Sequence, residues 1–210
     1  MPRKTFEASL EDLNVELIKM GATVETAINS AIIAFKNHDE KLAKEVVDQD
    51  RIIDDMEKDI ESKCLSLILR QQPVACDLRV VSTALKMVTD MERIGDQAAD
   101  IAELVMDFTG ELGYTSIEHI PAMAEVAVSM VHGAIAAFVN HDVEAAREII
   151  KKDDVVDELF EKVKQDVSKS LQANAKNSDM DINFLMIAKY LERIGDHAEN
   201  ICEWIEFSET

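Results

Sequence analysis

Glycine, proline and aromatic residues are scarce in this sequence. Its 210 residues include six Gly and three Pro, and aromatic residues make up 5% of the chain. Gly and Pro are the poorest helix formers, so their scarcity leaves long stretches that can stay helical. Ala, Glu, Lys, Leu, Ile and Val are abundant instead. The composition therefore predicts an all-α soluble protein.

Positively charged residues are outnumbered by negatively charged ones. Lys and Arg number 22 against 42 Asp and Glu, which gives a formal net charge of −20. Proteins that bind DNA or RNA need basic surfaces to neutralise phosphates, so nucleic acid is excluded as a partner. An acidic surface suits cations or basic protein surfaces instead.

Cysteine usage and the N-terminus indicate a cytoplasmic protein. Cys64, Cys76 and Cys202 are an odd number and share no CxxC spacing, which argues against a disulfide scaffold or a zinc knuckle. The N-terminal residues include basic side chains but no apolar stretch, so we expect no signal peptide.

One segment, residues 122–139, is apolar enough to raise the question of a membrane span. Glu125 and His132 interrupt it, and it barely reaches spanning length. We predict a core helix here and no membrane insertion.

The sequence contains an internal repeat. AIIAFKNHD at residues 31–39 matches AIAAFVNHD at residues 134–142 in seven of nine positions, and MERIGD at 91–96 returns as LERIGD at 191–196. The offset falls from 103 residues to 100 between these two pairs, so three residues were lost in a connecting turn. The chain therefore consists of two copies of one unit.

Each copy is predicted to form three helices. Apolar periodicity places them over residues 9–36, 39–70 and 77–108, and over 116–139, 142–171 and 179–207. Long helices joined by short turns lie antiparallel, so each copy is an antiparallel three-helix bundle. Gly110, Gly113 and Pro121 mark the connection between the copies. We predict two tandem domains, residues 1–110 and 111–210.

Acidic residues follow one face of the second and third helices. Glu92 and Asp96 are four residues apart, as are Asp50 and Asp54, and like charges at this spacing mildly destabilise a helix. Asp54 and Glu92 each lie 19 residues from Pro73, and Asp50 and Asp96 each lie 23 residues from it. Equal distance from the turn means equal height in antiparallel helices, so the four carboxylates can converge.

The second copy repeats this arrangement with Asp153 and Asp157 against Glu192 and Asp196. Clusters that offer only oxygen ligands suit Mg²⁺, Mn²⁺, Ca²⁺ or iron. A bound cation would also remove the repulsion between like charges. The alternative is that these helices present ordinary solvated acidic faces, and the spacing alone leaves both interpretations open.

Two three-helix repeats, each with DxxxD on its second helix and ERIGD on its third, resemble the PhoU family of phosphate-signalling proteins. The resemblance covers essentially the whole chain, and the doubled ERIGD and NHD motifs make it specific. It implies a non-enzymatic cytoplasmic adaptor that represses the phosphate-starvation response. Such an adaptor links the ATPase subunit of a phosphate ABC transporter to a membrane sensor histidine kinase, and a homodimer is implied as well.

The resemblance further implies metal ions on the bundle surface, either iron, zinc, manganese or magnesium. The positions of this sequence that match the family's acidic motifs are the candidate ligands. They are the paired acids of both copies: Asp50, Asp54, Glu92, Asp96, Asp153, Asp157, Glu192 and Asp196. The copies differ nearby, because Ala99 corresponds to Glu199 and Asp100 to Asn200. The number of ligands and the preferred metal can therefore differ between the two sites.

Several other residues carry separate expectations. His38 and His141 sit in the two NHD segments, where we expect turn residues, and His197 follows a candidate ligand and could reach a cation. Gly95 and Gly195 lie in mid-helix, where each costs about 1 kcal/mol relative to Ala. Our hypothesis is that these glycines allow two helices to approach closely.

Enzyme motifs are absent from the sequence. No His has Glu three residues before it, as a ferritin-like oxidase requires, and there is no GxxxxGK[ST] or GxSxG motif. We therefore predict that the chain is not an enzyme. The main alternative to the PhoU interpretation is a metal-free helical scaffold of the spectrin-like or BAG-like type, and a metal-dependent enzyme comes third.

Overall fold

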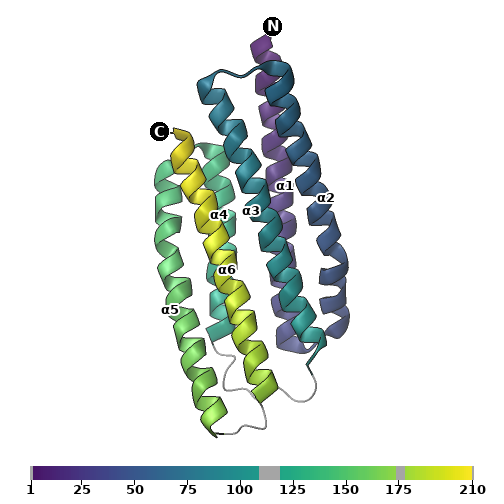
Figure 1. The fold of residues 1–210 in the computed structure, drawn as a ribbon, viewed down its shortest axis with the longest axis vertical. Helices are drawn as coiled ribbons and strands as arrows, with labels where there is room; N and C mark the ends of the chain where they lie inside the picture. Colours follow the sequence, from purple (N-terminus) through teal and green to yellow (C-terminus); the bar gives the residue numbers. More distant parts are fainter. Residues whose placement is uncertain (1, 109–118, 174–177, 210) are drawn as a thin grey trace.

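Six long helices make up the chain in this computed structural model, which describes residues 2–108, 119–173 and 178–209. No strand occurs within these residues. The first three helices and the last three form two antiparallel bundles (Figure 1), which confirms the predicted fold class. The helices are α1 Pro2–Asn37, α2 Glu40–Gln71, α3 Ala75–Met106, α4 His119–Asn140, α5 Val143–Ala173 and α6 Ser178–Glu209.

Several helix ends differ from the predicted ones. The first helix begins at Pro2 rather than at residue 9, and the buried Phe6 extends its apolar side toward the N-terminus. The other described ends agree within about two residues, which is the usual uncertainty of helix boundaries. The predicted start of the fourth helix at residue 116 and the predicted domain boundary at 110/111 lie outside the described residues.

The two NHD segments form equivalent turns between helices. His38 and His141 adopt left-handed backbone conformations with φ of 52° and 54°. The carboxylate of Asp39 then accepts a hydrogen bond from the N–H of Leu42 at 3.0 Å, which caps the start of α2. Asp142 caps α5 in the same way. The expected turn role of both histidines is confirmed.

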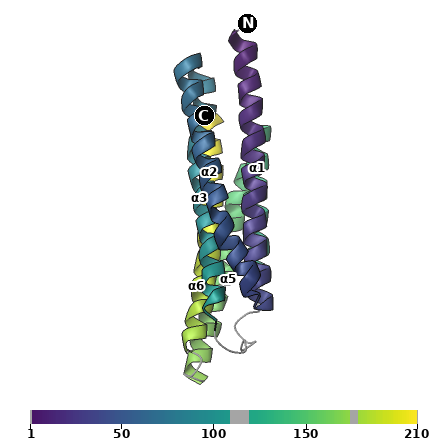
Figure 2. The ribbon, with the colours of Figure 1, turned by 90° about the vertical axis from the view of Figure 1, so that its right-hand side faces the viewer.

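The helices are arranged in two layers. Helices α2, α3, α6 and α5 lie side by side in one layer, and α1 and α4 pack behind them (Figures 1 and 2). The antiparallel pair α3 and α6 lies in the middle of the larger layer and joins the two bundles, as do α1 and α4 behind it. At one end of the molecule, the turn between α2 and α3 projects beyond the end of α6 (Figure 1).

One continuous apolar core runs through both bundles. Three aromatic rings join the repeats where the ends of three helices meet: Phe35, Phe108 and Phe184 lie with ring centroids 5.8 to 5.9 Å apart. The core side of α3 is at most 1% exposed and consists of Met87, Met91, Ile94, Ala98, Ile101 and Val105.

The apolar segment around residues 122–139 belongs to α4, whose core side includes the buried Met123, Ala127 and Met130. This helix is therefore a core helix, as predicted. Both α1, from Phe6, and α4 are long and apolar enough to cross a membrane by length and composition alone. Core helices pass the same test, and about half of the most apolar stretch in each is buried here.

Candidate metal centre

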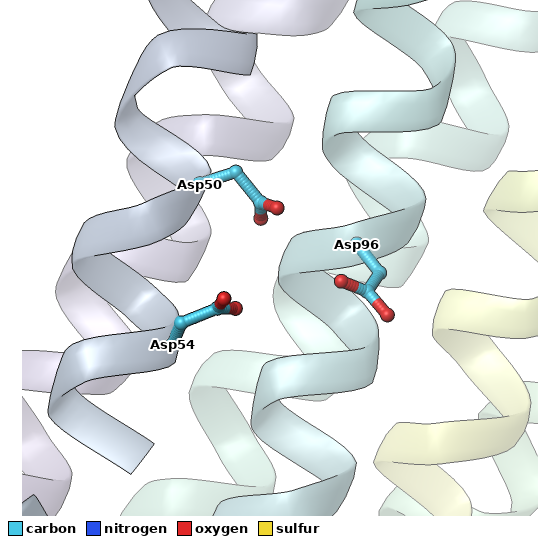
Figure 3. Close-up of side chains that lie close together, drawn as sticks. All are labelled: Asp50, Asp54 and Asp96. Carbon is cyan, nitrogen blue, oxygen red and sulfur yellow. The ribbon is translucent and has the colours of Figure 1, made fainter. Parts of the chain in front are cut away.

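Three carboxylates converge between α2 and α3 on the outer side of the larger layer. Asp50 and Asp54 come from successive turns of α2, and Asp96 faces them from α3 (Figure 3). One oxygen from each side chain lies within 4.8 Å of the others, and all three residues are partly buried. We call these residues the acidic trio.

A glycine on α3 makes room for the acidic trio. A Cβ atom at Gly95 would lie 2.9 Å from Cδ1 of Ile53 and 3.5 Å from Oδ1 of Asp50. In the second repeat, a Cβ atom at Gly195 would lie 2.8 Å from Oδ1 of Asp153. Real Cβ atoms essentially never come closer than 3.0 Å. Both glycines therefore allow the close helix approach that we hypothesised.

The charge on Asp50 is poorly compensated. Its Oδ1 atom is buried and has no hydrogen-bond partner among the described residues. Burial, followed by the charges of Asp96 and Asp54, raises the pKa of Asp50 from 3.8 to about 6. A buried, unpaired carboxylate is costly, and a cation between the three side chains would supply the missing partner.

Glu92 lies close to the acidic trio without joining it. Burial and then Asp96 raise the pKa of Glu92, and Glu57 on the facing helix adds to the rise. Arg93 on the surface partly balances this charge, since it lies 3.5 Å from Glu92 and 3.1 Å from Asp96. The structure thus brings three of the four predicted acids of the first repeat together and leaves the fourth one beside them.

The equivalent acids of the second repeat are arranged differently. Oδ1 of Asp153 is again buried without a hydrogen-bond partner among the described residues. Burial raises the pKa of Asp153 to about 7, with Glu199, Asp196 and Asp157 contributing in that order. In the part of the chain that the structure describes, however, no second group of three metal-binding side chains lies as close together as the acidic trio.

Basic residues also distinguish the two repeats. Lys189 forms an ion pair with Glu192, whereas the corresponding residue of the first repeat is Thr89. Phe160 takes the place of Glu57, and the ammonium groups of Lys164 and Lys189 lie 5.4 and 5.5 Å from its ring centroid. The second site therefore carries more positive charge than the first, a difference that the sequence comparison of Asp100 and Asn200 did not reveal.

His197 makes a contact between the repeats. Its Nδ1 lies 2.9 Å from Oδ1 of Asp90 on α3, and the amide of Asn200 donates to the same oxygen at 3.5 Å. A contact between His197 and a cation, which remains a prediction, would therefore have to use Nε2. The sequence did not single out Asp90, because no periodic pattern pairs a residue of one repeat with a different position of the other.

The acidic trio fits a hard cation. Oxygens bound to one Mg²⁺ or Ca²⁺ ion lie about 2.0 to 2.6 Å from it, so any two of them are at most about 4 to 5 Å apart. The three oxygens lie within 4.8 Å of one another, which is inside the limit for the larger of these ions. Carboxylates are ligands that Mg²⁺, Mn²⁺, Ca²⁺ and iron all accept. The unpaired, buried oxygen of Asp50 favours a cation site over an ordinary solvated face.

The chain is similar to one known protein family over most of its length. The PhoU domain matches twice, over residues 17–105 and 120–205. The chain is 39% identical to the phosphate-specific transport system accessory protein PhoU homolog of Clostridium acetobutylicum, over 97% of this chain and 93% of that protein. It is 30% identical to the accessory protein PhoU of Escherichia coli, over 95% of this chain and 83% of that protein.

Solved structures show the same fold. The crystal structure of PhoU from Pseudomonas aeruginosa is similar with a TM-score of 0.89 and 32% identity, and the match covers 97% of this chain and 98% of that one. The regulatory protein PhoU from Streptococcus pneumoniae gives the same TM-score at 26% identity, covering 98% and 97%. Relatives named as accessory and regulatory proteins confirm that the chain is not an enzyme, and they argue against a spectrin-like or BAG-like origin. The chain belongs to the PhoU family.

Proposed function

We propose that this chain is a cytoplasmic regulator of phosphate uptake and of phosphate-responsive transcription. It would act as a homodimeric adaptor between the ATPase subunit of a phosphate ABC transporter and a membrane sensor histidine kinase. Support comes from relatives that are named accessory proteins of the phosphate-specific transport system and a phosphate transport system regulatory protein. An adaptor without enzyme activity also agrees with a surface made of long, regular helices.

The second part of the proposal is that the paired acids hold metal ions. The observation that carries it is the acidic trio, with its buried and unpaired Asp50 oxygen. The proposed ligands are Asp50, Asp54, Glu92 and Asp96 in the first repeat and Asp153, Asp157, Glu192 and Asp196 in the second. Iron, zinc, manganese and magnesium are the candidates, and oxygen ligands alone favour manganese, magnesium or iron over zinc.

The metal would matter for docking because the ligands come from two helices. Asp50 and Asp54 are fixed to α2 and Asp96 to α3, so shared ligation would hold these helices in one arrangement. A bound divalent cation would also offset most of the negative charge of the acidic trio. The outer face of the larger layer would then present a defined surface to the kinase or the ATPase subunit.

Metal content is the first experiment. The protein is purified without chelator or affinity tag, and its metals are measured by mass spectrometry beside an Asp54→Ala/Glu92→Ala/Asp96→Ala variant. We expect stoichiometric metal in the wild type and a partial loss in the variant, which keeps the second site. If both proteins stay empty after metal addition, the acids are solvated faces and the metal part of the proposal is rejected.

Partner binding tests the regulatory part. Pull-downs of the transporter ATPase subunit and of the kinase are repeated in the presence and absence of chelator. Binding that weakens when metal is removed supports the coupling between metal and docking. Unchanged binding would reject that coupling but keep the adaptor, and no binding to either partner would reject the adaptor itself.

A further inference from the structure

A patch of large apolar side chains is exposed where α2 turns into α3. Leu65, Leu69, Val74 and Leu78 are 47%, 78%, 70% and 40% exposed. Leu69 and Leu78 lie four and five residues from Pro73 on antiparallel helices, so they are at nearly the same height. Leu65 is one turn below Leu69 on the same face. We call these four residues the tip patch.

The tip patch lies on the same side of the hairpin as the acidic trio. Leu65 follows Asp54 by 11 residues, which is a rotation of only about 20° beyond three full turns. Leu78 precedes Asp96 by 18 residues, which is five full turns of a helix. The outer face of the hairpin is thus apolar at its tip and acidic below it.

The second repeat leaves the tip patch uncovered. Both views show the α2–α3 turn projecting beyond the end of α6, so that no described helix of the second repeat reaches it (Figures 1 and 2). The patch does not serve the contact between the bundles, which is made by α3 with α6 and by α1 with α4.

Negative charge dominates the surface just below the tip patch. Glu57 and Glu61 lie on α2, and Glu92 on α3 is an electrostatic neighbour of Glu57. Lys58 is the basic residue in this stretch of α2, and it lies 4.0 Å from the carboxylate of Asp54.

Basic residues at the tip lie on other sides of the hairpin. Arg70 is rotated about 100° from Leu69 on α2, and Arg79 is rotated about 100° from Leu78 on α3. Arg70 lines a small cavity of about 210 Å³ with Ser9 of α1, on the side of α2 that faces the smaller layer. The outer face therefore combines leucines with carboxylates that Lys58 and Arg93 balance only in part.

The corresponding tip of the second repeat lacks this combination. Ser168 and Gln172 stand where Leu65 and Leu69 stand in the first repeat. Ile182 and Met186 on α6 are 50% and 37% exposed, but two lysines accompany them: Lys164 takes the place of Glu61, and Lys189 takes the place of Thr89. The exposed leucines with an acidic flank are a property of the first repeat alone.

Charge decides which partner suits the tip patch. A second copy of this chain would bring another strongly acidic surface against the carboxylates, and an anionic membrane would be repelled in the same way. A helix with an apolar stripe and a basic flank satisfies both parts of the surface, because its stripe covers the leucines and its flank meets the glutamates. We propose that the tip patch and the carboxylates below it bind a cationic amphipathic helix of a protein partner.

This inference goes beyond the proposed function, since it names the chemistry of a partner segment and needs no metal. The probe is a fluorescent synthetic helix of about 18 residues, with Leu along one stripe and Lys on one flank. A matched peptide carries Glu in place of Lys. Anisotropy titrations of the full chain are run with chelator present, so that a failure of the metal proposal does not affect them.

Two double variants separate the tip patch from apolar exposure in general. Leu69→Ser/Leu78→Ser removes the centre of the patch, and Ile52→Ser/Val155→Ser removes two side chains of similar exposure elsewhere, 52% and 44%. We expect the first variant to weaken binding of the Lys peptide about tenfold or more and the second to leave it unchanged. All four positions are exposed, so both variants should fold, which circular dichroism checks.

Charge is tested by two further comparisons. The Glu peptide should bind the wild type about tenfold more weakly than the Lys peptide, and added salt should narrow that gap. Leucines grafted onto the second tip, as Ser168→Leu/Gln172→Leu, should not create a second site for the Lys peptide. Equal binding of the two peptides, or a second site in the grafted variant, would overturn the role of charge.

The remaining outcomes identify other occupants. The inference is overturned if the Lys peptide does not bind the wild type, or binds the Leu69→Ser/Leu78→Ser variant equally well. It is also overturned if that variant still binds the Lys peptide but no longer self-associates in sedimentation experiments, because the patch would then bind a second copy of the chain. If the variant still binds the Lys peptide but no longer binds phosphatidylcholine vesicles, the patch binds a lipid surface instead.

Discussion

Replacing Asp50 by Asn should make the metal-free protein more stable and at the same time prevent its stabilisation by metal. Asn has the shape of Asp without the charge, so it fits beside Gly95 and removes the repulsion from Asp54 and Asp96. An ordinary surface substitution changes stability by less than about 0.5 kcal/mol in either direction. A clear gain would identify Asp50 as a residue kept at a cost in stability.

The magnitude follows from the raised pKa. The pKa of Asp50 rises from 3.8 to about 6, and each unit corresponds to about 1.4 kcal/mol, which gives an upper limit of about 3 kcal/mol at pH 7.5. Asp50 is only partly buried, so solvent screening reduces the expected gain to about 1 to 2 kcal/mol. Metal at 100 times its dissociation constant would stabilise the wild type by about 2.7 kcal/mol.

The pH dependence has a definite sign. A carboxylate with a raised folded-state pKa binds more protons in the folded protein than in the unfolded one, so stability falls as pH rises. The contribution of Asp50 is present near pH 4 and is lost as pH passes about 6. The contribution of Asp153 is lost by about pH 7. Asp50→Asn should therefore remove the loss of stability near pH 6 and leave the loss near pH 7, which belongs to Asp153.

Urea unfolding at pH 5 and pH 7.5, with chelator and with Mn²⁺, measures all these quantities. The control is Asp55→Asn, because Asp55 is exposed on the same helix. In chelator at pH 7.5, the free energy of unfolding of Asp50→Asn should exceed that of the wild type and that of the control. With Mn²⁺, the free energy of unfolding of the wild type should rise to that of Asp50→Asn. A variant no more stable than the wild type in chelator would refute the claim that Asp50 is an unpaired charge that costs stability.

A close helix contact, an ion pair and a helix cap can each be tested by one substitution. Gly95→Leu should lower the free energy of unfolding by about 1 to 3 kcal/mol, because its side chain would overlap Ile53; unchanged stability in a urea titration would remove the close-approach hypothesis. Lys189→Thr frees Glu192 and should tighten Mn²⁺ binding at the second site, measured by calorimetry, whereas weaker binding would contradict the assigned role of the lysine. Asp39→Ala removes the cap of α2 and should cost about 1 kcal/mol in thermal unfolding, and an unaltered melting temperature would show that the cap contributes nothing.

Much of the fold could be predicted from the repeat and the apolar periodicity. The doubled ERIGD and NHD motifs identified the two copies, and apolar periodicity gave three helices in each. Counting from Pro73 predicted that Asp50 and Asp96 come close together on facing helices, as they do. These predictions succeed because a helix is regular, so that rise and rotation per residue carry over long distances. Gly95 could be interpreted for the same reason, since a costly residue in mid-helix indicates a close contact.

The parts that could not be predicted depend on single side chains between helices. Glu92 has the right height but pairs with Arg93, and its distance from the acidic trio depends on a flexible side chain. α3 contacts α6, where His197 lies within hydrogen-bond distance of Asp90. The apolar pattern of each helix shows which side is buried but does not identify the helix that covers it. The change from Glu57 to Phe160 could have been found by aligning the second helices of both copies.

The two-layer arrangement also orients the electric field of the molecule. α1 has five acidic and four basic residues, and α4 has one acidic residue and neither Lys nor Arg, so this pair carries −2 of the formal −20. The remaining charge lies on the four helices of the larger layer and on the connections. A basic partner that approaches at low salt is therefore guided to one broad side of the molecule before any contact forms, and its association rate should fall steeply as ionic strength rises.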